Sequence, residues 1–487
     1  MQNTAPSPKL AKAILVIIAI LLFFIIGLAL PNFGVQSLVP AILPIAALVI
    51  LIRPDLGLLL TVAMIPIENV FVFGDEVTAV RLLGMYVAGA WALQKVLRRE
   101  PWRPLLSSPL FKSTLPLLFL VAVSTAWATN PASAYDGLFQ LLRMILLGLL
   151  VLDLANSQKR IDWLIKAVVI GGLVAASLVL NQYYNEHAVR AGDEIAGGVN
   201  GTAALLVLIV QFAFYLIRSQ AGRFWRWLGV VYITMAIVAV LVTFSRTSYV
   251  LLSLVLAINY WETIKNRKLF LPLIFTVIAL VIIGRNLLPQ DVIDFRVKTM
   301  FPYFQQTFSK SGEETSARGF AWRVGLAMFR SNPLWGVGYG SFNDAYRDYR
   351  TDVTNTVIRM GSRRSAHNVY IAFLAELGMF GLILWLITLF AGLPRLIKAY
   401  NQCSKDKSSR QWIIVQTVLY CFLIEVSYGW AIDIVTDKML WFLLGLSMAV
   451  SGLVSKEHQS DPIEKLIPTK TSKGKYEKRL GTVDYSR

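Results

Sequence analysis

Long runs of apolar residues, separated by short polar segments, recur along almost the whole chain. A run of about 20 apolar residues is long enough to cross the hydrocarbon core of a bilayer as an α-helix. Because lipid offers no hydrogen-bond partners, the backbone of such a run must satisfy its own polar groups as a helix. The chain lacks the ten-residue segments of strict apolar–polar alternation that mark membrane β-barrels. The pattern therefore predicts an all-α polytopic membrane protein with about 12–14 transmembrane helices.

The apolar runs divide into about fourteen expected spans, whose boundaries are good to a few residues. The first run is long for a signal-peptide core and no small-residue cleavage site follows it, so we expect it to be a spanning helix. The fourteen expected spans cover residues 13–30, 35–52, 57–73, 79–97, 112–128, 136–155, 161–181, 199–217, 227–244, 248–263, 269–285, 368–393, 411–429 and 437–454.

Lysine and arginine residues gather in alternate loops, after the even-numbered spans, and again in the tail from Lys456. Short loops rich in these residues face the cytoplasm. We therefore expect both termini to be cytoplasmic. The net charge of +18 is explained by these loops and does not call for a nucleic-acid partner.

The topology predicts four parts of the chain. Residues 1–285 form an N-terminal helix bundle, 286–366 a large external loop with amphipathic helices, 367–455 the C-terminal membrane helices, and 456–487 a basic, disordered cytoplasmic tail. The external loop is longer than the ~60 residues to which the charge rule applies, so its arginines do not contradict the topology.

Three polar residues from distant parts of the chain fall at the external surface: Arg190, Arg246 and His367. Arginine stays charged and binds phosphate through two parallel hydrogen bonds. Histidine titrates near pH 6.5, and neighbouring arginines would lower its pKa and keep the ring neutral. The set suits transfer chemistry on a phosphorylated lipid. Each residue also has a structural alternative, as an interfacial anchor or a helix-capping residue.

Ionisable residues inside the expected spans lie in the outer half of their helices. Such residues are costly in lipid, so they either line a water-filled vestibule or pair with one another. They are Glu68, Arg81, Arg143, Glu376 and Glu425.

The external loop carries further patterned residues. Positions 318–330 have helical spacing, and Asn332-Pro333 should end that helix. The glycines at 336, 338 and 340 favour a turn over a phosphate-binding loop. Asp344, Asp348 and Asp352 share a helix face, but interleaved arginines favour ion pairs over a metal site. We therefore expect neither a metal nor another cofactor.

Three motifs resemble the O-antigen ligase and polymerase superfamily. They are Ser245-Arg246-Thr247, the stretch RGFAWRVGLAMFRSNPLWGVG from Arg318 to Gly338, and His367-Asn368 followed by Glu376 and Gly378. The resemblance covers roughly residues 185–390, and the first half of the chain matches only in hydropathy. The stretch around Arg190 departs from the family pattern, because no proline follows it where the family has an Asp-Pro-Asn-like sequence.

The resemblance implies a membrane glycosyltransferase of the GT-C-like type in the bacterial inner membrane, with its active site facing the periplasm. The donor would be a glycan on undecaprenyl pyrophosphate, and the acceptor a sugar hydroxyl of a lipid A–core or another glycan. The implied partners are these substrates and membrane lipids. His367, Arg246 and Arg190 would be catalytic. The residues that would bind substrate are Arg318, Arg323, Arg143, Asn368 and Glu376.

Other functions stay open at this point. A polymerase would use the same donor and join it to a second lipid-linked repeat unit, and a related enzyme would glycosylate proteins. A transporter or flippase would move an anionic lipid-linked substrate with the same arginines. Short cytoplasmic loops and the lack of an internal repeat disfavour transport. A purely structural scaffold would have no need of charges gathered on one side.

The topology makes a direct prediction. A cysteine at Ser311, in the external loop, should react with a membrane-impermeant maleimide added outside intact spheroplasts. Labelling only after the membrane is opened would place this loop in the cytoplasm and overturn the topology together with the site.

Overall fold

The structure is a computed structural model of the full chain, and it describes residues 38–73, 77–185, 191–193, 195–219, 222–263, 317–353, 364–404, 406 and 408–464. The chain divides into two compact units. The first holds the described residues of Met1–Thr61 and Arg81–Pro101, and the second holds those of Val62–Val80 and Trp102–Arg487. Every predicted site residue that the structure describes lies in the second unit.

The described part of the first unit consists of α2 (Leu38–Ile52), most of α3 (Pro54–Met64) and most of α4 (Ala79–Leu97). The helical conformation is disfavoured for a residue that precedes proline, so α2 ends before Arg53, and Pro54 begins α3. The chain bends by 118° at this break. Tyr86 and Gln94 of α4 donate hydrogen bonds to carbonyls of α2, at 2.8 and 2.6 Å, which ties these two helices together.

The second unit consists mainly of helices. Its strands β1 (Val72–Phe73) and β2 (Val77–Thr78) form a two-stranded antiparallel sheet in which Val72 pairs with Thr78. The helices in chain order are η2 (Ile65–Ile67), α5 (Arg103–Leu106), α6 (Pro109–Ser124), α7 (Pro131–Leu154), α8 (Gln158–Asn185), α9 (Gly198–Arg218), α10 (Arg223–Thr243), α11 (Arg246–Thr263), α14 (Ala317–Ser331), α15 (Phe342–Val353), α16 (Val369–Phe390), α17 (Leu393–Cys403), α18 (Arg410–Tyr428) and α19 (Lys438–Glu464).

Seven segments of the described chain are long and apolar enough to cross a membrane. They are α7, α8, α9, α10, α16 with α17, α18, and α19 as far as His458. Each coincides with a predicted span, and the prediction of an all-α polytopic membrane protein is confirmed. α19 continues to Glu464, so the beginning of the tail that we expected to be disordered is helical instead.

Five other expected spans differ from the structure. Residues 35–52 and 57–73 correspond to the bent pair α2 and α3, which amounts to one span at most. Residues 112–128 become α6, an apolar helix of only 16 residues. Residues 79–97 and 248–263 are helical as α4 and α11, but polar and charged side chains keep both below the hydropathy of a span. The described chain therefore holds seven spans, or up to eight, where twelve were expected; the other two expected spans, 13–30 and 269–285, lie outside the described residues.

Helix α9 is the centre of the bundle that positions Arg246. It packs against α8, α10, α11 and α18, and every residue from Thr202 to Leu216 is buried. Two neighbouring helices are bonded to it by polar side chains: the Asn259 amide of α11 donates to Gln211 Oε1 at 2.6 Å, and the Tyr232 hydroxyl of α10 donates to the Leu206 carbonyl at 2.9 Å. Such bonds offset the cost of placing polar groups away from water, and they lock α10 and α11 onto α9.

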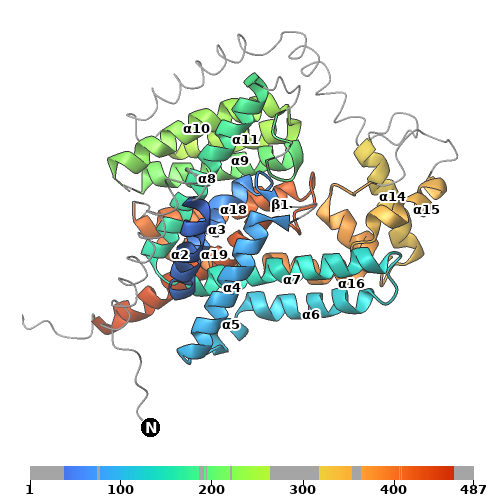
Figure 1. Cartoon of the computed structure of the whole chain (residues 1–487), viewed down its shortest axis with the longest axis horizontal. Helices are drawn as coiled ribbons and strands as arrows, with labels where there is room; N and C mark the ends of the chain where they lie inside the picture. The colour runs from blue at the N-terminus through green and yellow to red at the C-terminus, as the bar shows by residue number, and fades with distance from the viewer. Residues whose placement is uncertain are drawn as a thin grey trace, which may run out of the picture. The chain divides into compact units, whose positions relative to one another are not determined.

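Helices α14 and α15, which belong to the predicted external loop, pack on one end of α16 (Figure 1). The predicted helix at 318–330 is confirmed as α14, and it ends at Asn332-Pro333 as expected. Phe320, Val324 and Met328 of α14 join Tyr346 of α15 and Ala372 of α16 in one buried apolar cluster. Helices α14 and α15 therefore share one apolar core with α16.

Helix α16 is broken at Gly378, whose backbone lies at φ 64° and ψ −159°. In a regular helix the Met379 N–H would donate to the carbonyl of Ala375. Here Met379 donates to the Pro333 carbonyl at 2.9 Å, and Ala375 instead accepts from the Val337 N–H at 3.0 Å. The segment that follows α14 thus supplies the hydrogen-bond partners that the broken helix has lost.

Glycines allow this close approach. Gly336 has φ +66°, and a Cβ atom there would lie 2.3 Å from the Glu376 carbonyl carbon. Gly338 has φ +96°, and its Cβ would lie 2.3 Å from the Cα atom of Ala128. The expected turn is therefore confirmed, and the reason for its glycines is backbone packing.

Replacing Gly336 by alanine should destabilise the protein. Gly222→Ala is the matched control, because Gly222 also has a positive φ (+96°) but a Cβ there meets nothing within 4 Å. Both variants force alanine into a left-handed conformation, at roughly 1–2 kcal/mol; only Gly336→Ala adds a clash. We expect a thermal unfolding midpoint in detergent that is several degrees lower for Gly336→Ala than for Gly222→Ala. Equal midpoints would show that the packing against α16 contributes little.

Candidate functional site

His367 sits in a short segment that neighbouring elements hold from both sides. The Trp322 indole of α14 donates to the Ala366 carbonyl at 3.1 Å, and Ala366 is buried in the apolar cluster. On the other side, the Asn368 side chain accepts from the backbone N–H groups of Tyr370 and Ile371, at 3.0 and 3.1 Å, and so caps α16. His367 itself has φ 47°. A left-handed non-glycine residue is strained and persists only where its surroundings enforce it.

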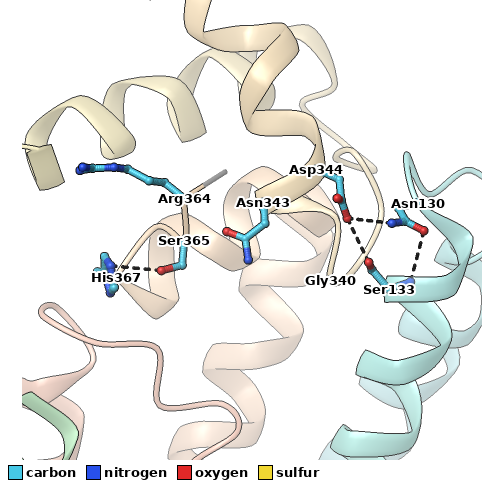
Figure 2. Close-up of a pocket in the computed structure, with 8 residues that line it drawn as sticks. All are labelled: Asn130, Ser133, Gly340, Asn343, Asp344, Arg364, Ser365 and His367. Carbon is cyan, nitrogen blue, oxygen red and sulfur yellow. Dashed lines mark hydrogen bonds between the residues drawn. The ribbon is translucent and has the colours of Figure 1, made fainter. Parts of the chain in front are cut away.

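His367 lines a pocket of about 520 Å³. One wall of the pocket carries Arg364, Ser365 and His367, and Figure 2 shows that the Ser365 hydroxyl faces the imidazole. The Ser365 Oγ atom lies 3.2 Å from His367 Nε2, within hydrogen-bond distance. The ring is thereby oriented by a neighbour only two residues away.

The opposite wall is built from the N-terminal turns of α7 and α15. The Asp344 carboxylate of α15 accepts hydrogen bonds from the Asn130 amide and the Ser133 hydroxyl, both at 3.0 Å. Asn130 also caps α7 through its side-chain oxygen. Asn343 lies between the two walls (Figure 2). Amides, hydroxyls, one carboxylate and one guanidinium therefore surround the cavity.

The pKa of the His367 imidazole is lowered from its ordinary value of 6.5. Burial is the largest cause, because surrounding protein atoms disfavour the charged ring even though the residue is open to the pocket. Repulsion by Arg318 and Arg364 adds to it. The direction agrees with the sequence-based expectation, but the two arginines come from the external loop. At neutral pH the ring is neutral and can accept a proton.

The junction between α10 and α11 holds Arg246. Phe244 ends α10 in a left-handed conformation (φ 54°), and Arg246 begins α11. The Ser248 hydroxyl donates to Ser245 Oγ at 2.9 Å, and the Tyr249 hydroxyl donates to the Leu241 carbonyl at 2.6 Å. Arg246 is half-buried in this tightly bonded turn.

The end of α18 connects the Arg246 junction with the His367 segment. Tyr428, at the end of α18, lies beside Ser248 of the junction. The next residue, Gly429, accepts a backbone hydrogen bond from Val369, two residues after His367, at 2.9 Å. Two of the family-like motifs therefore meet the same helix end.

Arg190 lies outside the described residues. The residue that follows Arg190, Ala191, is buried and donates to the Val242 carbonyl at 3.4 Å. Val242 belongs to the last turn of α10. Ala191 therefore lies next to the end of α10, close to the junction that holds Arg246.

The predicted substrate-binding residues take up different positions. Arg318, at the start of α14, is near enough to lower the pKa of His367. Arg323 lies over the Phe320 ring at 5.9 Å, and Arg143 is about 15 Å along α7 from the pocket residue Ser133. Neither of them lines the pocket described above.

Asn368 and Glu376 have structural contacts in the described chain. Asn368 is fully buried and caps α16, whereas Glu376 is buried and accepts from the Phe342 N–H at 2.9 Å, at the start of α15. Their predicted contact with substrate stays a prediction.

One of the charges in the expected spans is explained by pairing. Glu68 binds Lys438 at 2.6 Å, whereas Glu425 lies against another acid, Asp437. Burial raises the pKa of Asp437, which lies between α18 and α19. For Glu68 the structure therefore supports the ion-pair alternative over a vestibule.

Sequence reasoning did not single out several residues of the pocket. Asn130 and Ser133 could have been found only as a helix start, from the Asn-Pro signature that caps α7. Asp344 was considered only for metal binding, and Arg364 and Ser365 are visible only as the polar residues before His367. The other missed residue is Asn343.

The fold and this site define a multi-pass membrane protein with a polar pocket at one end of its helices. Residues 228–386 match the model of the protein family described as O-antigen ligase. The matched segment includes the Arg246 junction, α14, α15, His367 and the break in α16. The resemblance to the O-antigen ligase and polymerase superfamily is thereby confirmed over this segment. No curated protein matches the chain.

Nuclear magnetic resonance of protein labelled in the histidine rings should show that His367 titrates below pH 6.5, with the signal assigned by its loss in His367→Gln. Arg318→Gln and Arg364→Gln should each raise this pKa, because each removes a nearby positive charge. Arg330→Gln is the matched control: Arg330 is exposed at the far end of α14, about 18 Å along the helix from Arg318. If the three substitutions have equal effects, the arrangement of charges around His367 is wrong.

Proposed function

We propose that the protein transfers an oligosaccharide or polysaccharide of the O-antigen type from undecaprenyl pyrophosphate to a sugar hydroxyl of a lipid A–core acceptor. The reaction takes place at the periplasmic face of the bacterial inner membrane. The observation that carries this proposal is the position of His367, which lines a polar pocket within the segment that matches the O-antigen ligase family. Burial and two nearby arginines lower its pKa, which favours the neutral ring that a base needs.

His367 acts as the general base. The acceptor hydroxyl oxygen attacks the anomeric carbon of the donor sugar, and its proton passes to the imidazole. The bond between that carbon and the pyrophosphate oxygen breaks, and its electron pair leaves with the pyrophosphate. A single displacement of this kind inverts the anomeric configuration. A positioned base contributes about 10²–10⁴-fold to such a reaction.

Arginines stabilise the leaving group. Pyrophosphate gains negative charge as the bond breaks, and preorganised cations that face it lower the barrier. Arg246 and Arg190 are proposed to hold it, because guanidinium binds phosphate oxygens in pairs. In this proposal they take the place that a divalent cation has in other transferases, so the reaction needs no metal.

The orientation in the membrane is supported by two helices of the site. α7 and α16 both begin at the pocket. Basic residues follow the ends of both: Lys159 and Arg160 after α7, and Arg395 and Lys398 beyond α16. Since basic loops face the cytoplasm, the helix starts and the pocket face the periplasm.

Purified wild type and His367→Ala should be compared with undecaprenyl-pyrophosphate glycan and lipid A–core in the presence of EDTA. We expect wild type to transfer the glycan and His367→Ala to lose at least about 100-fold in turnover while donor binding is kept. His458→Ala is the matched control, because His458 is exposed at the far end of α19 and should leave turnover unchanged.

The same assay separates the alternatives. A wild type that extends its donor but leaves lipid A–core untouched is the polymerase. A loss of transfer in EDTA that added Mg²⁺ restores would contradict the metal-independent mechanism, and full activity of His367→Ala would exclude His367 as the base.

A further inference from the structure

We infer that the pocket beside His367 is the binding site for the acceptor sugar, and that Asp344 and Asn343 determine which sugar is accepted. This inference rests on the proposed function, since it takes His367 to be the base. It goes further by assigning a substrate class and specificity to residues at the starts of α7 and α15.

The position of the base decides which substrate enters the pocket. A general base must lie within hydrogen-bond reach of the proton that it removes, and that proton belongs to the acceptor hydroxyl. His367 is part of the pocket wall. The sugar ring that carries the reacting hydroxyl must therefore occupy the space next to the imidazole.

The lining suits a neutral sugar. Side chains that line the cavity offer amide, hydroxyl, carboxylate and guanidinium groups, and large apolar side chains are absent from the lining residues that the structure describes. Sugar hydroxyls both donate and accept hydrogen bonds, so they match this mixture. The volume of about 520 Å³ falls in the range of small-molecule pockets, about 300–1,000 Å³.

The wall opposite His367 is preorganised. The Asn130 and Ser133 hydrogen bonds hold the Asp344 carboxylate in one orientation. Asn343 is exposed beside it, and within the described chain its side chain is not committed to a hydrogen bond. A ligand hydroxyl that reaches this wall meets an oriented carboxylate and an available amide, so binding costs little reorganisation.

The pyrophosphate of the donor does not suit this pocket. The start of α7 carries a partial positive charge that favours an anion, but the Asp344 carboxylate already lies there, bonded to the α7 cap. A second anion would be repelled by it. The donor pyrophosphate belongs instead with Arg246 of the α10–α11 junction, and the two substrates approach His367 from different groups of residues.

The test compares Asp344→Asn and Asn343→Ala with wild type. Asp348→Asn is the matched control, because it makes the same change one turn further along α15, away from the pocket lining. Initial rates should be measured with lipid A–core and undecaprenyl-pyrophosphate glycan varied in turn. We expect Asp344→Asn to raise the KM for the acceptor roughly tenfold or more, as loss of a charged hydrogen bond does. Asn343→Ala should raise it by roughly threefold to tenfold.

The KM for the donor should stay within about twofold of wild type in both variants, and Asp348→Asn should match wild type throughout. An unchanged acceptor KM in both pocket variants, or a rise in the donor KM instead, would overturn the inference. A merely structural role for Asp344 would lower turnover and the unfolding midpoint together and would leave the acceptor KM as it is.

A binding measurement without the donor separates failure of this inference from failure of the proposed function. Saturation-transfer NMR with soluble core oligosaccharide should detect binding to wild type and to His367→Ala, and weaker binding to Asn343→Ala. If wild type binds the oligosaccharide in this way but transfers no glycan, the proposed function is wrong and the pocket assignment stands. Equal binding by wild type and Asn343→Ala overturns the assignment even where transfer is observed.

Discussion

The exchange of backbone hydrogen bonds at the break in α16 is the constraint on which the candidate site depends. A helix broken inside a membrane protein leaves carbonyl and N–H groups that must find partners, because each unsatisfied buried group costs about 1–3 kcal/mol. The segment after α14 provides those partners at Ala375, Glu376 and Met379. The same contact fixes α14 and α15 on the membrane helix, and the Glu376 side chain holds the first turn of α15. Together with the buried apolar cluster that α14 and α15 share with α16, it sets the position of these two helices.

Backbone strain recurs at the two motifs that carry the proposed chemistry. Phe244 precedes the Arg246 junction and His367 precedes α16, and both are non-glycine residues with positive φ. Each such residue costs on the order of 1 kcal/mol, so its surroundings must hold it in place. Around His367, the Trp322 bond to Ala366 and the Asn368 cap do so. A strained segment held at both ends presents its side chain in one direction, which suits a group that must reach a particular proton.

The charges divide between two regions around the site. Two cations, Arg318 and Arg364, lie near His367, and a third, Arg246, begins α11. The far wall of the pocket is neutral apart from the hydrogen-bonded carboxylate of Asp344. Such a division matches the two proposed substrates, one of which develops negative charge while the other is a neutral sugar. Burial, with repulsion from the arginines, also lowers the pKa of His367 and so favours the unprotonated imidazole where a base is needed.

Hydropathy and charge, which are local properties of the sequence, determined the membrane class, seven of the spans, the helix at α14 and its end at Asn332-Pro333. They failed at α2, α3 and α6, because an apolar run shows that a segment can be buried but does not show how long its helix is. The motifs indicated His367 and Arg246 because those residues stand in a recognisable order. Only the tertiary structure brought Asn130 and Asp344 to His367, because hydrogen bonds between segments more than 200 residues apart leave no periodicity in the sequence. It also decided that Glu376 is a buried acceptor, since the Phe342 N–H that it binds comes from the start of α15.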